Sequence, residues 1–149
     1  MVQKNIQIKA PIQTVFDCVT DFESYPKFLP DMKKTKVVWI DDNQMEVNFH
    51  LNLIKEISYT LLIDLDPPQG VYWKLKSGDL MKKNCGSWEL KMIDDYLTQA
   101  AYAIDIEFGL WVPKTITQTL IEKSLPQTLK QFKKQAEKLF KKKGSTLES

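Results

Sequence analysis

Residues 44–53 read QMEVNFHLNL, and apolar and polar side chains alternate along the whole stretch. Successive side chains of a β-strand point to opposite faces of its sheet, so the alternation predicts a strand with one buried face. The residues expected on the buried, concave face are Met45, Val47, Phe49, Leu51 and Leu53. His50 belongs to the other set and is expected to be exposed, because a shift of one residue would exchange the two faces.

Similar alternation continues on both sides of this strand and is interrupted by short turns. The expected strands are Val2–Ala10, Lys36–Asp41, Gln44–Leu53, Ile57–Leu65, Val71–Ser77, Ser87–Asp94 and Leu97–Phe108. The stretch Gly78–Gly86 is polar, basic and irregular, so no strand is expected there. Strands that follow one another with short connections predict an antiparallel sheet, and seven twisted strands should curl.

Two short helical segments are expected after the first strand. Pro11 can begin a helix, because its missing N–H costs little at the first helical position. One apolar stripe follows, which indicates a helix ending near Asp21 and consists of Ile12, Val15, Phe16 and Val19. The next segment, Phe22–Pro30, contains two prolines and permits at most one further turn of helix.

After Gly109 the apolar residues recur at spacings of three to five, which predicts a long amphipathic helix from about Pro113 to Lys143. Gly144 is expected to end this helix, leaving 145–149 as a frayed tail on a single domain, 1–144. The order of elements predicts an α+β fold. In it, a curled seven-stranded antiparallel sheet wraps around the long C-terminal helix.

Pro126 lies within the predicted long helix. It should kink the helix or restart it, with Ser124 and Gln127 as a capping pair. A kink would let the two halves tilt independently. We therefore expect the Pro113–Lys123 half to border any cavity under the helix, and the later half to pack tightly on the sheet and the short helices.

Composition excludes several classes of function. All 21 basic residues are lysines and the net charge is +2, so neither a guanidinium-dependent mechanism nor DNA binding is expected. Cys18 and Cys85 lie far from each other and from the lone His50, so we expect no metal site and two buried free thiols in a reducing compartment. No glycine-rich phosphate loop is present, so no cofactor is expected.

No catalytic residue is predicted either. His50 falls on the polar face of its strand, and the carboxylates are scattered over turns and outer faces. The chain opens without a signal-peptide pattern and has no apolar run of about 18 residues, which favours a cytoplasmic protein.

Several motifs are shared with a known family. The most specific is Asp-x-x-x-Tyr-Pro-x-Phe-Leu-Pro, from Asp21 to Pro30. Further matches are Ala10-Pro11-Ile12 before Val15-Phe16, Gly86-Ser87-Trp88-Glu89-Leu90, and Leu125-Pro126 before Leu129 and Phe132. With this order of elements, the chain resembles the START-like (helix-grip) superfamily of bacterial and other proteins. The resemblance is greatest to its coenzyme-Q-binding branch, also labelled polyketide cyclase/dehydrase, and it covers almost the whole chain.

The resemblance implies a partly open apolar cavity between the sheet and the C-terminal helix, although the same aromatic residues could simply fill a core. The residues expected to bind a ligand are Phe28, Phe49, Tyr59, Trp73, Trp88, Tyr102, Val112, Ile116 and Leu120. Tyr59, Tyr102 and Thr117 are candidates for polar contacts. The leading hypothesis is non-enzymatic binding or transport of an isoprenoid quinone or a lipid. A polyketide cyclase/dehydrase and a ribosome-associated regulator are the alternatives within the family.

Lysines gather near the end of the long helix, at Lys130, Lys133, Lys134, Lys138, Lys141, Lys142 and Lys143. Cations are favourable near a helix C-terminus, so this can be an ordinary solvated face. The alternative is peripheral contact with an anionic membrane or with the ribosome. The Tyr25–Pro30 segment also has two interpretations, a lid at the open end of the sheet or a rigid corner packed on the core.

Overall fold

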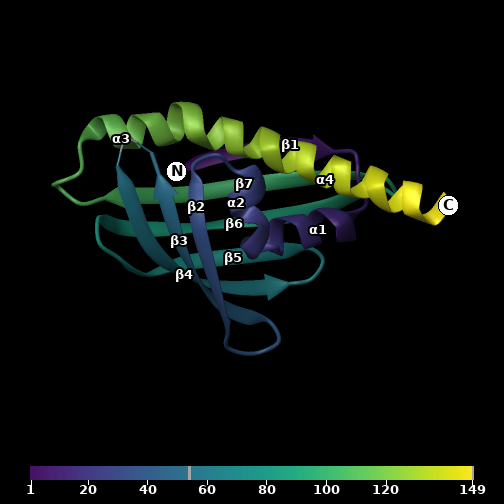
Figure 1. Ribbon diagram of the computed structural model, residues 1–149, viewed down its shortest axis with the longest axis horizontal. Coiled ribbons are helices and arrows are strands. Elements are labelled where there is room, and N and C mark those ends of the chain that lie inside the picture. Colours follow the sequence, from purple (N-terminus) through teal and green to yellow (C-terminus); the bar gives the residue numbers. More distant parts are fainter. Residues whose placement is uncertain (54, 149) are drawn as a thin grey trace.

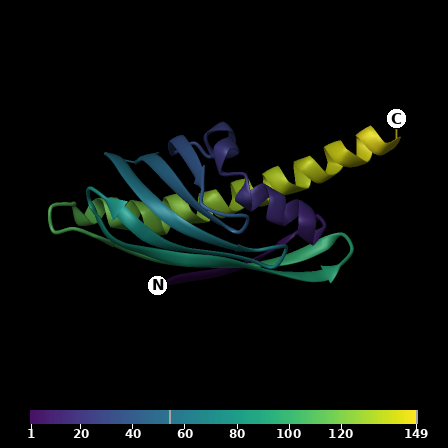
Figure 2. The same ribbon diagram turned by 90° about the horizontal axis from the view of Figure 1, so that it is seen from below.

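The computed structural model describes residues 1–53 and 55–148, with side chains as far as residue 142. Seven antiparallel strands form one sheet in the order β1-β7-β6-β5-β4-β3-β2, and the sheet curls around a long helix (Figures 1 and 2). The strands are β1 (Val2–Ile8), β2 (Met32–Trp39), β3 (Gln44–Asn52), β4 (Glu56–Asp66), β5 (Gly70–Gly78), β6 (Met81–Asp94) and β7 (Leu97–Phe108). The predicted α+β fold is confirmed.

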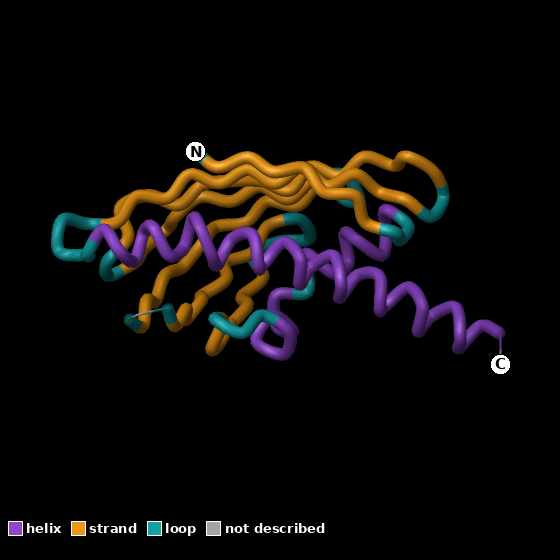
Figure 3. Tube along the Cα trace, turned by 90° about the horizontal axis from the view of Figure 1, so that it is seen from above, coloured by secondary structure: helices purple, strands orange, loops and turns teal. Residues whose placement is uncertain are grey.

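Helical segments occur at two places in the chain, as predicted. Between β1 and β2 lie α1 (Ile12–Thr20), the 3-10 turn η1 (Phe22–Ser24) and α2 (Tyr25–Phe28). After β7 come α3 (Lys114–Thr119), the wide turn η2 (Leu120–Ser124) and α4 (Leu125–Glu148). These last three form one rod that crosses the concave side of the sheet, and its C-terminal end extends beyond the sheet (Figure 3).

The alternation in β3 is confirmed. Met45, Val47, Phe49 and Leu51 are buried, and Leu53 just after the strand is half-buried. His50 lies on the opposite face with 31% of its side chain exposed, beside Glu56 at 3.4 Å. Because β3 pairs with β4 on one side and β2 on the other, its register fixes which side chains face the interior.

Three predicted boundaries are wrong by four residues or more. β6 begins at Met81, within the stretch that lacked alternation, because pairing with β7 supplies the strand there and a bulge between Met81 and Lys83 interrupts the pattern. β2 begins at Met32 instead of Lys36. The last helix continues past Gly144 to Glu148. In the first two cases, pairing with neighbouring strands overrides the local pattern.

Pro126 neither breaks the rod nor restarts it. A proline cannot donate to the carbonyl four residues before it, so the α-helical ladder cannot be completed at this point. The chain accommodates this with the wide turn η2, in which the Leu125 N–H donates to the Leu120 carbonyl, five residues back. Ser124 makes no capping hydrogen bond at this turn. The irregularity is therefore a local widening, and it faces the concave side of the sheet.

The C-terminal helix is also tied to the edge strand β1. Lys133 Nζ donates to the Gln7 carbonyl at 2.7 Å and to Glu137 at 2.9 Å. Glu137 in turn accepts the backbone N–H of Lys9 at 2.9 Å. These contacts, together with the buried side chains of Leu129, Phe132 and Ala136, hold α4 against the sheet and α1.

No helix in the described part of the chain is long and apolar enough to span a membrane.

Candidate ligand cavity

A cavity of about 120 Å³ lies between the concave face of the sheet and the long helix. It is close in size to the cavities of about 150 Å³ that bind a benzene ring. From the sheet it is lined by Phe49, Leu51, Tyr59, Leu61, Ile63, Val71, Trp73, Met81, Asn84, Trp88, Tyr102, Ile104 and Ile106. The remaining lining residues are Phe22, Tyr25, Leu29, Pro30, Asp31, Met32, Leu120, Ser124, Leu125, Gln127, Thr128 and Phe132.

Aromatic rings form opposite walls of this cavity. On one side Phe49 stacks on Tyr59, with ring centroids 5.3 Å apart and planes at 22°. On the other side Tyr102 lies between Trp73 and Trp88, at 5.8 and 4.7 Å. Such pairs contribute about 0.5–1.5 kcal/mol each beyond the burial of their area, so both walls are well ordered.

The Tyr25–Pro30 segment closes one end of the cavity as a fixed corner. The Tyr25 hydroxyl donates to the Val19 carbonyl, and the ring packs against Phe132 of α4 with centroids 5.1 Å apart. Thr35 of β2 donates to the Phe22 carbonyl at 2.7 Å, which holds the other side of the corner. Burial raises the pKa of Tyr25 well above its usual value. These contacts favour the rigid-corner interpretation over a moving lid.

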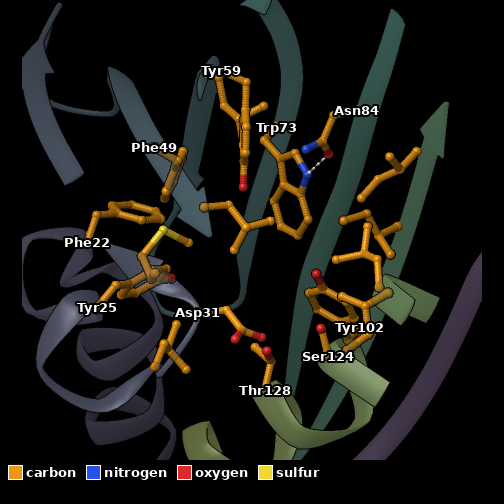
Figure 4. Close-up of a pocket in the computed structure, with 18 of the residues that line it drawn as sticks. Phe22, Tyr25, Asp31, Phe49, Tyr59, Trp73, Asn84, Tyr102, Ser124 and Thr128 are labelled. Atoms are coloured by element: carbon orange, nitrogen blue, oxygen red, sulfur yellow. Dashed lines mark hydrogen bonds between the residues drawn. The ribbon is translucent and has the colours of Figure 1, made fainter. Parts of the chain in front are cut away.

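A buried amide lies deep in the cavity wall. Asn84 is only 3% exposed, and its Oδ1 accepts the indole N–H of Trp73 at 3.1 Å (Figure 4). This bond assigns the oxygen of the amide to Trp73. The Asn84 amide nitrogen forms no hydrogen bond with any described residue. The amide therefore retains donor capacity on the cavity wall.

Two phenol hydroxyls also lack partners in the described part of the chain. Tyr59 and Tyr102 are 8% and 9% exposed, yet neither hydroxyl bonds to a described residue. Every side-chain polar atom that is completely enclosed does have a partner among the described residues, so these two hydroxyls face open space. Figure 4 shows both pointing toward the middle of the cavity. Burial raises the pKa of each phenol well above its usual value, which keeps both protonated.

The opening lies between the corner and the start of α4. Pro30 and Gln127 are the exposed members among the described lining residues, so they mark the opening. Asp31 and Thr128 lie half-buried on this same side of the cavity in Figure 4. Asp31 carries the one carboxylate in the described lining, which contains no lysine, histidine or cysteine.

The structure brings six of the nine predicted ligand-binding residues to this cavity. These six are Phe49, Tyr59, Trp73, Trp88, Tyr102 and Leu120. Val112 and Ile116 are buried elsewhere, and Ile116 is only 1% exposed. Phe28 packs behind the wall, against Tyr25 and Phe132. Of the proposed polar contacts, Thr117 lines a separate small pocket beside β1 and not this cavity.

The expected division of the long helix is also wrong. The cavity touches the rod from Leu120 to Phe132, around η2 and Pro126, so the Pro113–Lys123 half contributes Leu120 alone and the later half supplies most of the helical wall. Figure 3 shows that the rod continues past Pro126 in one piece, and Ile116 in its first half is buried in the core.

Five polar lining residues escaped the sequence analysis: Asn84, Ser124, Gln127, Asp31 and Thr128. Asn84 is an even number of residues from Trp88 and therefore points to the same face of β6, but the irregular composition of Gly78–Gly86 concealed this. Ser124 and Gln127 were interpreted only as a capping pair. Asp31 and Thr128 come together from segments distant in sequence, and no local pattern marks them.

The described residues contain no group of three or more potential metal ligands. His50 lies outside the cavity, and Cys18 is buried away from it, whereas Cys85 is half-buried on β6. On α4, Lys130, Lys134, Lys138, Lys141 and Lys142 are exposed, and Lys133 is held by Gln7 and Glu137. The Lys143 side chain lies outside the described residues.

Residues 8–133 match the family model described as polyketide cyclase/dehydrase and lipid transport. The chain belongs to this family. The START-like helix-grip fold expected from the Asp21–Pro30 motif is thereby confirmed, and solved structures support it. No curated protein matches the sequence of this family member.

Several solved structures share the fold of this family member at low sequence identity. The Zhui aromatase/cyclase from a Streptomyces species has a TM-score of 0.80 at 16% identity, covering 91% of this chain and 92% of that one. A START superfamily protein from Mycobacterium smegmatis has a TM-score of 0.78 at 20% identity, with 93% and 97% covered. A STAR-related lipid transfer protein from Xanthomonas axonopodis has a TM-score of 0.72 at 11% identity, with 90% and 84% covered.

Proposed function

We propose that this protein binds an apolar small molecule in the cavity between the sheet and the C-terminal helix. The observation that carries the proposal is the cavity itself. It has an apolar wall with several aromatic side chains and a few polar groups that have no partner among the described residues. Sites for small apolar ligands have this composition. The family description includes lipid transport, which is consistent with a carrier.

The size of the cavity narrows the range of ligands. A volume of about 120 Å³ suits a ring system and does not suit a complete phospholipid with two acyl chains. The ring of an isoprenoid quinone, or one end of a single-chain lipid, would occupy the cavity, with the remaining chain leaving between Pro30 and Gln127. We propose binding or transport without catalysis as the primary role.

A polyketide cyclase/dehydrase is the second candidate. The family description and the fold shared with an aromatase/cyclase favour it. In that case Tyr59 and Tyr102 would donate to ketone oxygens, and Asp31 would be the available carboxylate. Incubation with a linear poly-β-ketone, followed by mass spectrometry of the products, separates the two roles. A carrier returns the ketone unchanged, whereas a cyclase/dehydrase releases water.

A substitution that fills the cavity tests the primary proposal. Leu120→Trp places an indole in the cavity and should abolish binding of the neutral fluorophore N-phenyl-1-naphthylamine while the protein remains folded. Ile121→Trp is the matched control, because the neighbouring side chain is 42% exposed and does not line the cavity. Equal binding by both variants would contradict the proposal. Native mass spectrometry of the purified protein, with solvent extraction, would identify any retained ligand.

Contact of the exposed lysines of α4 with an anionic membrane or the ribosome is a separate proposal. Replacement of Lys134, Lys138, Lys141 and Lys142 by Gln should reduce co-sedimentation with anionic liposomes if the membrane is the partner. Added salt should have the same effect. Loss of ribosome co-sedimentation in this variant would favour the regulator, and unchanged behaviour in both assays would leave a solvated face.

A further inference from the structure

Three polar groups on the sheet wall of the cavity can each donate a hydrogen bond to a ligand. Tyr59 and Tyr102 present hydroxyls without protein partners, and Asn84 retains the donor capacity of its amide nitrogen. These groups belong to the wall formed by β4, β6 and β7, and Figure 4 shows Tyr102 beside Ser124 of the rod. A ligand that entered with an oxygen acceptor foremost would therefore meet several hydrogen-bond donors.

The orientation of Asn84 supports this interpretation. Its amide oxygen could have been the group that faced a ligand, but it is engaged by the Trp73 N–H at 3.1 Å. The tryptophan thus removes an acceptor from the site and leaves the donor. Both phenols remain protonated because burial raises their pKa values. An unsatisfied buried donor is costly, so each of these groups gains by meeting an acceptor.

The charge of the cavity completes the argument. No lysine or histidine lies in the described lining, and the chain contains no arginine. The one charged lining residue that the structure describes is Asp31, near the opening, and its carboxylate repels anions. Moving an unpaired carboxylate or phosphate from water into such surroundings is strongly unfavourable.

We infer that the cavity selects neutral ligands carrying a carbonyl-type oxygen, to which Tyr59, Tyr102 and Asn84 donate hydrogen bonds from the sheet wall, and that it rejects carboxylate and phosphate headgroups. This inference rests on the proposed ligand-binding function and names the ligand class for it. Free fatty acids and phospholipids are thereby excluded as preferred ligands, whereas quinones, ketones and esters fit.

Three naphthalenes of nearly equal size test the inference: 2-acetonaphthone, 2-naphthoate and 2-ethylnaphthalene. They carry a neutral acceptor, an anion and no acceptor, respectively. By equilibrium dialysis at pH 8 we expect 2-acetonaphthone to bind at least ten-fold more tightly than 2-naphthoate. Tyr59→Phe and Tyr102→Phe should each weaken the ketone about five-fold, the value of one ordinary hydrogen bond, and leave 2-ethylnaphthalene unchanged.

Tyr25→Phe is the matched control, because this tyrosine lines the same cavity but its hydroxyl is engaged by Val19. It should leave the ratio of ketone to hydrocarbon affinity unchanged. Equal binding of all three compounds, or unchanged ratios in the Tyr59 and Tyr102 variants, would overturn the inference while the proposed function stands. Binding of none of them would overturn both. Tight binding of 2-naphthoate would assign the site to anions instead.

Discussion

The indole ring of Trp73 lies against Gly86, its partner across the β5–β6 ladder. A methyl group at residue 86 would lie 2.5 Å from Cζ2 of that ring and 2.3 Å from the Ala103 carbonyl oxygen. Glycine is therefore required here by the closeness of its neighbours and not by its backbone dihedrals, since no described residue has a positive φ. The absent side chain allows Trp73 to lie flat in the cavity wall and reach Asn84.

Gly86→Ala should consequently displace Trp73 or the β7 backbone. We expect a loss of about 1–3 kcal/mol in the free energy of unfolding, as for other overpacked sites. Urea denaturation followed by circular dichroism measures it. Gly109→Ala is the control: its added methyl would meet only the Leu80 carbonyl at an ordinary 3.6 Å. A Gly86 variant as stable as the Gly109 variant would contradict the packing described for Trp73.

Truncations along the rod should distinguish the core from the cavity wall. Ile116→Ala and Leu129→Ala remove buried side chains outside the cavity and should each cost about 2–5 kcal/mol. Leu120→Ala should cost less, because a side chain beside an existing cavity has fewer contacts to lose. Ile121→Ala, at an exposed position, should lie within about 0.5 kcal/mol of the parent. Thermal and urea unfolding measure the stability lost in the four variants. If Ile116 bordered the cavity, Ile116→Ala would cost less than Leu129→Ala.

The two cysteines should differ in reactivity. Burial raises the pKa of the Cys18 thiol to about 12, with smaller contributions from the charges of Asp21 and Asp17. The thiolate is the reactive form, so native Cys18 should resist iodoacetamide at pH 8, whereas half-buried Cys85 should be alkylated first. Peptide mapping of the alkylated protein measures both sites. Labelling of Cys18 at the rate of Cys85 without denaturant would show that the α1 packing opens readily.

Stability should fall at alkaline pH. Cys18, Tyr59 and Tyr102 all have pKa values raised by burial, so the folded protein retains protons that the unfolded chain releases. The contribution of these three groups to stability should therefore be constant below about pH 8.5 and decrease above it, by up to about 1.4 kcal/mol per pH unit for each group. Cys18→Ala should reduce the loss of stability between about pH 8.5 and 10, because the thiol of an unfolded chain ionises in this range. A stability that rises between pH 9 and 11 would contradict the burial of these groups.

The sheet could be predicted from the sequence where one face of a strand is buried. In β3 and β4, apolar side chains such as Phe49 and Tyr59 alternate with polar ones, and the period is unambiguous. In β6 the bulge near Met81 breaks the period, and Asn84 places a polar side chain at an inward position that lines the cavity. The local pattern therefore does not show which face of this strand is buried.

The cavity could be predicted only in part, for a different reason. Its aromatic residues lie on strands whose register the sequence determines, so Trp73, Trp88 and Tyr102 were found. Its helical wall depends on how the chain resolves the missing N–H of Pro126. A kink and a wide turn both satisfy that requirement, and they place different residues over the sheet. The packing of Ile116 and Leu120 follows from that choice.

The contacts of α4 with β1 bear on how the protein avoids aggregation. An open sheet presents two unpaired edges, and each can recruit a strand from another molecule. At the β1 edge, Lys133 donates to the Gln7 carbonyl and Glu137 accepts the Lys9 N–H, so these two backbone groups are not available to pair with another strand. At the β2 edge, protection comes from the exposed charges of Lys33, Lys34 and Lys36. The first protection is built into the fold, whereas the second weakens in concentrated salt, which makes β2 the edge where self-association would begin.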